Sequence, residues 1–279
     1  MNLLAITWDI DPILFQIGTF GIRYYSLLFA LGFVIGYFVV KKIYQQEQIP
    51  IKELDNLVIY VVFGGLIGAR LAHCLFYDWE YYLSGWKEII EIFLPISFYP
   101  EFHFVGYQGL ASHGGAIGII IAMLLFRRKS TQKNILWLLD RVAVPTGFAG
   151  ACIRFGNLFN SEIYGHQTNK AWGFIFVQNG DTWASHPTQI YEALCYITTS
   201  LVLMYLYKFE RFRNARGFLL GIFLIMIFTA RFFIEFLKNN QVAFEENLSL
   251  NMGQWLSIPF VIGGALLVYI SLKIKNKQN

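Results

Sequence analysis

The chain has 279 residues, of which 56% are hydrophobic and 14% are charged, with a formal net charge of +4 and a mean hydropathy of +0.48. Soluble proteins carry about 25% charged residues, so this chain has too little polar surface to cover a water-soluble globule. The composition therefore excludes a soluble enzyme, a disordered chain and a secreted disulfide scaffold. The three cysteines are scattered through apolar runs and are predicted to be packed, free thiols.

Seven apolar runs are each long enough to cross a bilayer, which takes about 20 residues. The third run is the weakest, because glycines interrupt it. The sequence therefore predicts an all-α integral membrane protein with seven transmembrane helices, organised as a single polytopic domain over residues 1–279. The predicted spans lie near residues 21–40, 56–77, 110–126, 135–155, 189–207, 217–237 and 255–273.

The basic residues outside the spans are distributed unevenly between the two sides of the membrane. Fourteen of the 22 Lys and Arg residues fall in alternate loops and in the C-terminal tail, whereas only Lys87, Lys170 and Lys238 fall in the loops on the opposite side. Basic loop residues prefer the cytoplasmic side. The N-terminus is therefore predicted to lie outside and the C-terminus in the cytoplasm.

The arginines left within the predicted spans are Arg23, Arg70, Arg141, Arg154 and Arg231. Arg23 and Arg141 lie near span ends, where a long basic side chain reaches the interface, and are expected to be anchors. The other three lie within their spans, in the outer halves. A charge at the bilayer centre costs about 2.5–3.5 kcal/mol. An ion pair is one explanation, since Glu235 has the right spacing from Arg231. A bound anion such as phosphate explains three arginines in one leaflet better.

Further polar residues gather in the same outer half. His113 opens the third span among small residues, and Gln189 and Glu192 are expected to point into the bundle. A lone histidine is more often structural, but His113 shares a leaflet with the arginines. The sequence contains no metal-binding motif, no nucleophile elbow and no phosphate-binding loop, so we expect neither a metal nor a cofactor.

The segment that follows the fourth span carries a recognisable signature. The run Arg154-Phe-Gly-Asn-Leu-Phe-Asn-Ser-Glu-Ile-Tyr-Gly165 resembles the signature segment of the prolipoprotein diacylglyceryl transferases. Other motifs of the family follow the same order along nearly the whole chain. They are Arg23-Tyr-Tyr, Gly68-Ala-Arg70, Ser112-His-Gly-Gly115, His186-Pro-Thr-Gln-Ile-Tyr-Glu192, Arg231-Phe-Phe-Ile-Glu235 and Gly253-Gln-Trp-Leu-Ser257.

The resemblance implies a multi-pass enzyme of the bacterial inner (cytoplasmic) membrane that catalyses the first step of lipoprotein maturation. Such an enzyme moves the diacylglyceryl group of phosphatidylglycerol onto the lipobox cysteine of a prolipoprotein signal peptide, and glycerol phosphate leaves. In the family, the arginines that match Arg154 and Arg231 are essential. The residues described as functionally important match Tyr25, His113, Asn157, Glu162 and Gly165. Ala69, Ser185 and Ile227 depart from the residues usual in the family.

The reaction needs a thiolate, stabilisation of the leaving phosphate, and alignment of carbon and sulfur. We expect His113 to be the general base, with an orienting role as the alternative, and Arg154 and Arg231 to clamp the phosphate. The expected substrate-binding residues are Tyr25, Arg70, Asn157, Asn160, Glu162, Gly165, Gln189 and Glu235. The expected partners are phosphatidylglycerol, prolipoprotein signal peptides and membrane lipids, with no nucleic acid. A transporter or flippase of an anionic lipid is the alternative function.

Overall fold

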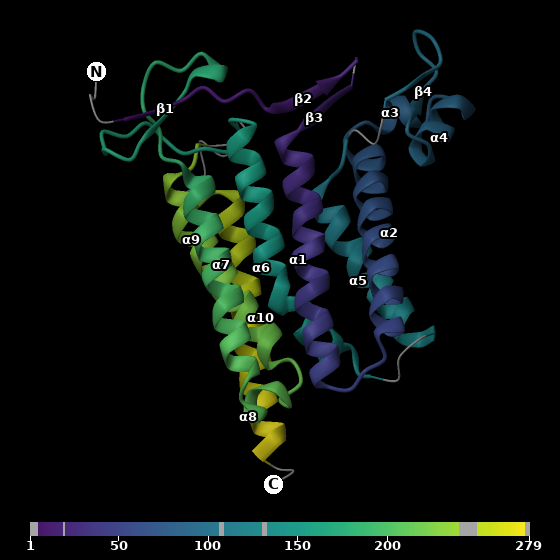
Figure 1. Ribbon diagram of the computed structural model, residues 1–279, viewed down its shortest axis with the longest axis vertical. Helices are drawn as coiled ribbons and strands as arrows, with labels where there is room; N and C mark the ends of the chain where they lie inside the picture. The colour runs from purple at the N-terminus through teal and green to yellow at the C-terminus, as the bar shows by residue number, and fades with distance from the viewer. Residues whose placement is uncertain (1–4, 19, 106–108, 130–132, 240–249, 277–279) are drawn as a thin grey trace. The chain divides into compact units, whose positions relative to one another are not determined.

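The computed structural model describes residues 5–18, 20–105, 109–129, 133–239 and 250–276. Long helices dominate this part of the chain, and one covers each of the predicted spans (Figure 1). The apolar runs of the sequence therefore locate the helices correctly. The long helices are α1 (Tyr24–Gln46), α2 (Ile51–Phe76), α5 (Ser112–Lys129), α6 (Ile135–Phe159), α7 (Thr188–Tyr207), α9 (Phe218–Ile234) and α10 (Met252–Asn276).

Short elements occupy the connections between these helices. The short helices are α3 (Trp79–Tyr82), α4 (Trp86–Phe93), η1 (Val177–Asn179), α8 (Glu210–Arg213) and η2 (Glu235–Leu237). The strands are β1 (Ile6–Trp8), β2 (Ile13–Ile17), β3 (Phe20–Arg23), β4 (Ile96–Ser97), β5 (His103–Phe104) and β6 (Phe174–Phe176). They form three two-stranded sheets, of which β1–β6 is parallel and β2–β3 and β4–β5 are antiparallel. The all-α prediction thus holds for the apolar helices, while the loops add strands.

The membrane character of the chain is confirmed. In the described ranges, six helices are long and apolar enough to cross a membrane, namely α1, α2, α6, α7, α9 with η2, and α10. Helix α5, which corresponds to the weak third run, is not among them, and its last turn holds three basic residues. The number of spans and the orientation of the termini stay predictions.

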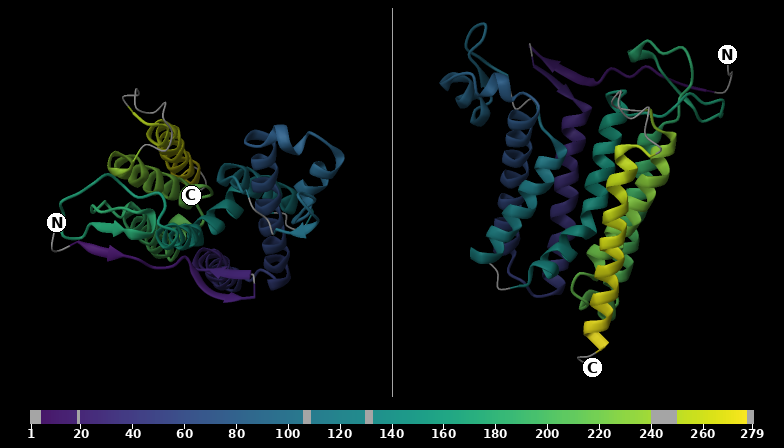
Figure 2. Two further views of the ribbon diagram at one scale, coloured as in Figure 1. Left: turned by 90° about the horizontal axis from the view of Figure 1, so that it is seen from above. Right: turned by 180° about the vertical axis from the view of Figure 1, so that it is seen from behind.

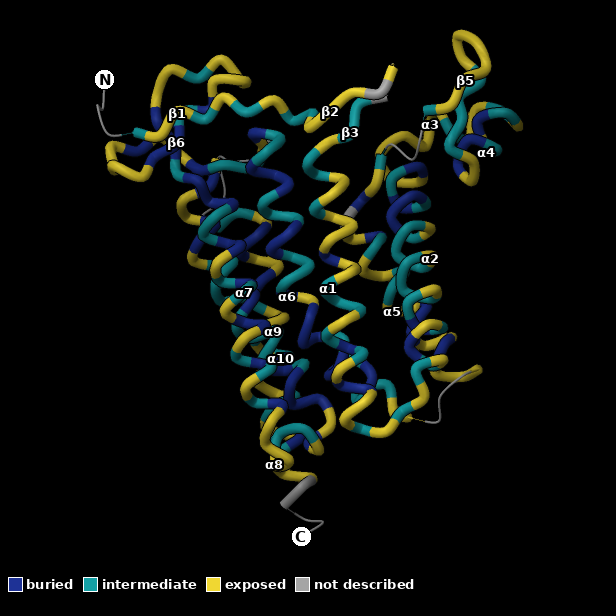
Figure 3. Tube along the Cα trace, in the orientation of Figure 1, coloured by how far each residue is buried: buried dark blue, intermediate teal, exposed yellow. Residues whose placement is uncertain are grey.

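The chain divides into two compact units, Met1–Ile43 with Leu139–Asn279, and Tyr44–Leu138. In the first unit, α6 is the most enclosed helix, because 56% of its most apolar stretch is buried, against 17% for α1 and for α10. Figure 3 shows exposed residues alternating with buried ones along the other helices of this unit, as expected of helices with one face against their neighbours. Within the unit, α6 is therefore a suitable support for polar side chains.

Close helix packing in the first unit depends on glycines of α6. A Cβ atom at Gly150 would lie 2.9 Å from the Tyr196 ring, and one at Gly147 would lie 2.5 Å from the Ser200 hydroxyl on α7. The same hydroxyl accepts a 3.1 Å hydrogen bond from the Phe148 backbone amide, three residues after Pro145, which lies inside α6. Helices α6 and α7 therefore approach closely at the turns that precede Arg154.

The second unit contains a second glycine-dependent helix pair, α2 and α5, which run side by side in both views of Figure 2. Gly64 and Gly68 of α2 face Gly114 and Gly118 of α5, and a Cβ at Gly68 would lie only 2.8 Å from the Gly118 Cα. Small residues four apart allow helices to approach at this distance in membranes. The glycines that weaken the third apolar run therefore serve helix packing.

One expectation about span ends is wrong. Arg141 is not an exposed anchor but is 2% exposed, and it donates a 3.1 Å hydrogen bond to the Arg213 carbonyl. Its neighbour Asp140 accepts the amides of Gly217 at 2.7 Å and Leu220 at 2.8 Å. Asp140 thereby satisfies amide groups at the beginning of α9 that have no partner within the helix. The prediction of free cysteines is confirmed, since Cys74, Cys152 and Cys195 form no disulfide.

Candidate functional site

Arg154 lies on α6 at the centre of a polar cluster in the first unit. Its Nε atom lies 2.8 Å from Glu192 Oε2 on α7, and another guanidinium nitrogen donates a 3.2 Å hydrogen bond to Asn157 Oδ1. The guanidinium carbon lies 6.0 Å from the centre of the Tyr196 ring. The Arg154 side chain is 14% exposed, whereas that of Glu192 is 0% exposed. This arginine is held by a carboxylate, an amide and an aromatic ring.

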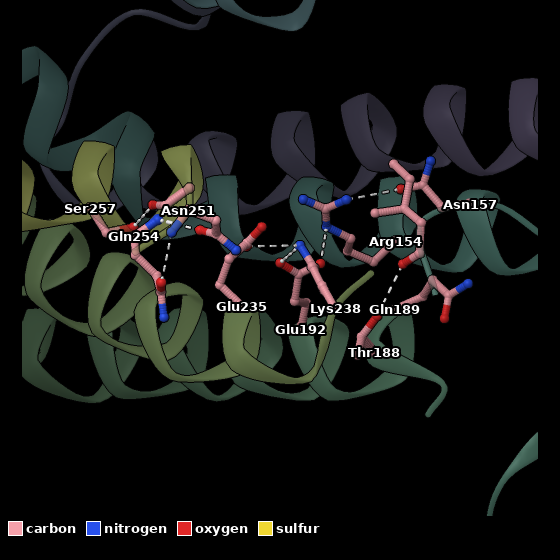
Figure 4. Close-up of polar contacts among 12 residues, drawn as sticks. Arg154, Asn157, Thr188, Gln189, Glu192, Glu235, Lys238, Asn251, Gln254 and Ser257 are labelled. Carbon is pink, nitrogen blue, oxygen red and sulfur yellow. Dashed lines mark hydrogen bonds and ion pairs between the residues drawn. The ribbon is translucent and has the colours of Figure 1, made fainter. Parts of the chain in front are cut away.

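The cluster continues beyond Glu192 as a row of alternating charges. Lys238 Nζ lies 2.9 Å from Glu192 Oε1 and 3.3 Å from Glu235 Oε2. Glu235 lies against α10, because a Cβ at Gly253 would lie 2.6 Å from its carboxyl carbon. Figure 4 shows the row running from Asn157 and Arg154 through Glu192 and Lys238 to the first turn of α10. Helices α6, α7, η2 and α10 thus meet through charged and polar side chains.

The first turn of α10 is fixed by its own polar residues. The Gln254 backbone N–H donates to Asn251 Oδ1 at 2.9 Å, and the Asn251 backbone N–H donates to Gln254 Oε1 at 3.0 Å. This reciprocal pairing is a capping box, which satisfies amides at a helix N-terminus. The Gly253-to-Ser257 motif of the sequence therefore begins a helix and brings Gly253 against Glu235.

The loop after α6 folds around Glu162. Asn157 Nδ2 donates to Glu162 Oε1 at 2.8 Å, and Asn160 Nδ2 lies 3.3 Å from the same oxygen. Ser161 and Ile163, on either side of Glu162, have positive φ angles of 53° and 60°. Such angles are uncommon for residues other than glycine and are strained for β-branched ones. The loop therefore holds Glu162 in a defined position, and Asn157 links it to Arg154.

Gln189 and Gly165 attach this loop to neighbouring elements. Gln189 Nε2 donates a 2.7 Å hydrogen bond to the Glu162 carbonyl, and the Gly165 amide donates to the His186 carbonyl at 2.8 Å. A Cβ at Gly165 would lie 2.8 Å from Thr188 and 2.9 Å from His186. Gly165 is required because its backbone passes too close to these side chains for any other residue.

Tyr25 and Arg231 complete the predicted site residues of the first unit. The Tyr25 ring on α1 lies against Gly156, where a Cβ would be 2.7 Å from the ring. Arg231 on α9 is half-buried. The suggested Arg231–Glu235 pair is not seen, because α9 ends at Ile234 and Glu235 faces Lys238 instead. Within the described ranges Arg231 has no ion pair with a carboxylate.

Arg70 and His113 belong to the second unit. Arg70 donates to the carbonyls of Glu91 at 2.7 Å and Ile92 at 3.3 Å, and its guanidinium lies 4.9 Å from the Tyr82 ring centre. His113 is exposed in the first turn of α5, with its ring centre 5.9 Å from that of Tyr77. The structure therefore gathers most of the predicted residues into one cluster within the first unit and places these two in the second.

His186 lies just before α7, at the edge of the cluster. Its Nδ1 atom is 3.1 Å from the Tyr191 hydroxyl, which also accepts a 2.9 Å hydrogen bond from Trp172. Burial lowers the pKa of His186 below its ordinary value of 6.5, and the charges of His166 and Lys170 lower it further. His186 is therefore neutral near pH 7.

Sequence reasoning missed the roles of Glu192 and Lys238. The sequence predicts that Glu192 points into the bundle but does not assign it to the site, and it predicts that Lys238 lies in a loop. Lys238 is in fact 2% exposed, because Glu192 and Glu235 neutralise its charge. An acidic residue within an apolar span was the available signal for Glu192. In the described part of the chain, no group of His, Cys, Asp or Glu is arranged to hold a metal ion.

Comparisons with known proteins identify the family of this chain. A family model described as prolipoprotein diacylglyceryl transferase matches residues 12–270. A Bacteroides fragilis protein named phosphatidylglycerol–prolipoprotein diacylglyceryl transferase is 48% identical over 276 residues, covering 98% of each chain. Proteins of the same name are 46% identical in Porphyromonas gingivalis, covering 96% of this chain and 95% of the relative, and 42% identical in Tolumonas auensis, covering 96% and 98%. The chain therefore belongs to the prolipoprotein diacylglyceryl transferase family.

Proposed function

We propose that the cluster around Arg154 binds the phosphate of phosphatidylglycerol while the diacylglyceryl group passes to a cysteine of a prolipoprotein. The chain is a membrane transferase of lipoprotein biosynthesis, and relatives along nearly its whole length are named for these two substrates. The observation that carries the proposal is the pair of intramembrane arginines in one unit. Arg154 is fixed by Glu192 and Asn157, and Arg231 has no ion pair within the described ranges.

The chemistry is an alkyl transfer. The thiolate sulfur of the prolipoprotein attacks the glycerol carbon that bears the phosphate ester, a carbon–sulfur bond forms, and the carbon–oxygen bond breaks. Glycerol phosphate leaves with the electron pair of that bond. Guanidinium groups held in a water-poor site stabilise the charge that grows on the leaving phosphate. Arg154 and Arg231 supply such groups in this proposal.

The thiol must lose its proton before or during the attack, since its ordinary pKa lies near 8.5. His113 is our candidate for the base, because an imidazole accepts a proton near neutral pH. Its exposed position in the first turn of α5 leaves the ring open to a proton donor. An orienting role for His113 remains the alternative, and the two are separated by their pH dependence.

The neighbouring polar residues position the lipid head group in our proposal. Gln189 is fully buried, and its amide nitrogen is engaged by the Glu162 carbonyl. Its Oε1 atom accepts no hydrogen bond from the residues that the structure describes. A buried acceptor without a donor costs about 1–3 kcal/mol, and a hydroxyl of the glycerol head group would satisfy it. The other residues proposed to position the head group are Tyr25, Asn157, Asn160, Glu162, Gly165 and Glu235. Arg70, which the sequence predicts to bind substrate, donates instead to carbonyls of α4, and we propose a structural role for it.

The topology belongs to the same proposal. We propose seven spans, from the seven apolar runs, with an external N-terminus and a cytoplasmic C-terminus, from the distribution of loop basic residues. We further propose that the whole chain acts as one polytopic domain of a bacterial inner membrane, and that it recognises the signal peptides of prolipoproteins within the surrounding lipids. Neither the family nor the relatives support the alternative of a lipid transporter.

The direct test is a reconstituted reaction. The purified chain, phosphatidylglycerol and a synthetic lipobox peptide should yield a peptide with a thioether-linked diacylglyceryl group and free glycerol phosphate, both detected by mass spectrometry. A peptide with serine in place of the cysteine is the control. Recovery of unmodified cysteine peptide under conditions where the lipid and the enzyme remain intact would overturn the proposal.

A further inference from the structure

Lys238 stands out because it is a buried cation in a segment whose composition predicts a solvated loop. It follows η2 directly, and its side chain is 2% exposed. Its backbone is fixed as well, since Lys238 pairs with Gly165 in an isolated antiparallel bridge and the His166 amide donates to the Leu237 carbonyl at 2.8 Å. The segment therefore holds the ammonium group in place rather than leaving it free to reach water.

The two oxygens of Glu192 face different cations. Oε2 lies 2.8 Å from Arg154 Nε, and Oε1 lies 2.9 Å from Lys238 Nζ. Lys238 also lies 3.3 Å from Glu235. The described part of this row thus holds two cations and two anions and is neutral before any ligand binds.

Charge balance in the row controls how strongly Arg154 attracts an additional anion. Without Lys238, two buried carboxylates would face a single guanidinium. An approaching phosphate would then meet a net negative charge at short range, where charges interact strongly because little water screens them. With Lys238 in place, the negative charge of Glu192 is shared, and Arg154 keeps its attraction for phosphate.

We propose that Lys238 is a positioning residue for lipid binding, whose charge offsets Glu192 and Glu235 and thereby keeps Arg154 able to bind the phosphate of the lipid substrate. This inference rests on the proposed role of Arg154. In this inference Lys238 does not contact the substrate. Its effect is therefore on the affinity for the anionic lipid rather than on the bond-breaking step.

The experiment varies charge at fixed shape in the purified full-length chain. Lys238→Met removes the charge, Lys238→Arg keeps it, and Lys238→Met combined with Glu235→Gln removes one charge of each sign. KM for phosphatidylglycerol and kcat are measured in mixed micelles with a lipobox peptide, and thermal unfolding confirms that each variant is folded. Lys170→Met, at an exposed lysine, is the matched control.

Lys238→Met should raise KM for phosphatidylglycerol about 10- to 100-fold, as expected when one partner of a buried charge pair is removed. Its kcat should change less than about threefold, because the bond-breaking step keeps its own groups. Lys238→Arg and Lys170→Met should stay within about threefold of the parent KM, because each leaves the row neutral. The charge-balanced double variant should have a KM at least about threefold lower than that of Lys238→Met, because it restores the neutrality of the row.

A parent-like KM for Lys238→Met would overturn the inference. So would a double variant as impaired as the single one, because the loss would then come from packing. If Lys238→Met does not fold, Lys238→Arg still decides, and a KM tenfold above the parent in Lys238→Arg contradicts the inference. Arg154→Ala distinguishes a failure of this inference from a failure of the proposed function. A parent-like KM in that variant would overturn the proposed role of Arg154.

Discussion

Arg154 and Arg70 both interrupt apolar helices, yet their guanidinium groups have different partners. Arg70 is 7% exposed and donates to the last carbonyls of α4, at Glu91 and Ile92. Arg154 contacts the buried carboxylate of Glu192 and the side-chain amide of Asn157. One arginine is satisfied by backbone, and the other is part of a network of charged side chains.

The difference teaches how the same sequence signal serves two purposes. The C-terminal end of a helix carries partial negative charge, so α4 stabilises the Arg70 cation without any ligand. The Arg154 row carries formal charges that are balanced between α6, α7 and the segment of η2 and Lys238. A bound phosphate would add negative charge to this neutral row. We infer that Arg70 holds α4 in place and that Arg154 is the arginine poised for an anion.

The largest effect is expected at Arg154. Arg154→Lys keeps the charge but loses the planar fork that pairs with phosphate, so kcat/KM should fall at least about 100-fold. The rate of thioether formation measures this, with Arg216→Lys, at an exposed position, as the control. Full activity in Arg154→Lys would mean that only positive potential is needed there.

A second large effect is expected at His113. If it is the base, His113→Gln should lose roughly 10²–10⁴ in rate. Raising the pH toward the ordinary thiol pKa should restore part of the loss, because thiolate then forms unaided. Transfer rates between pH 6 and 9 measure this. A near-normal rate with a parent-like pH profile would assign His113 to orientation and leave the arginine clamp unaffected.

A smaller effect, on stability alone, is expected at Asp140. Asp140→Asn replaces a carboxylate that accepts the Gly217 and Leu220 amides, and one amide then faces an NH₂ group. The free energy of unfolding should fall by about 1–3 kcal/mol, measured by thermal unfolding in detergent. Glu210→Gln, whose side chain is exposed, should change it by less than about 0.5 kcal/mol. Equal stability of Asp140→Asn and the parent would contradict the capping role.

The smallest effect is expected from His186. Its folded-state pKa lies below the ordinary 6.5, so the unfolded chain takes up the proton first as the pH falls. The contribution of His186 to the free energy of unfolding is therefore fully present above about pH 6.5, and it is lost as the pH falls through the lower pKa of the folded state. Melting temperatures at pH 5 and 7.5 should differ more in the parent than in His186→Gln. Identical differences would show that His186 does not contribute.

The sequence predicts the long helices well because each of them lies on an apolar run, including the third run that glycines interrupt. It does not predict the strand pair β1–β6, whose partners at Ile6 and Phe174 are far apart along the chain. Such short strands depend on a distant partner rather than on a local pattern. The same limit applies to Arg141, whose burial depends on contacts with the Arg213 carbonyl.

In the candidate site too, contacts within one motif are predictable and contacts between distant segments are not. Asn157 and Glu162 belong to the same short motif as Arg154, so the grouping of these three residues, in which Asn157 contacts both of the others, was foreseeable. Lys238 was not, because its position beside Glu192 depends on how η2 and α7 pack. A count of loop charges places a lysine on a side of the membrane, but it does not show whether a buried carboxylate covers it.

The most direct test of the central claim is the affinity of the folded protein for phosphatidylglycerol in two variants, Arg154→Lys and Arg70→Lys. Binding is measured at equilibrium, by native mass spectrometry or lipid titration, with thermal unfolding to confirm that each variant is folded. The account predicts that Arg154→Lys raises the dissociation constant at least about tenfold, whereas Arg70→Lys leaves it within about threefold and lowers stability instead. Unchanged affinity in Arg154→Lys, or a tenfold loss in Arg70→Lys, would contradict it.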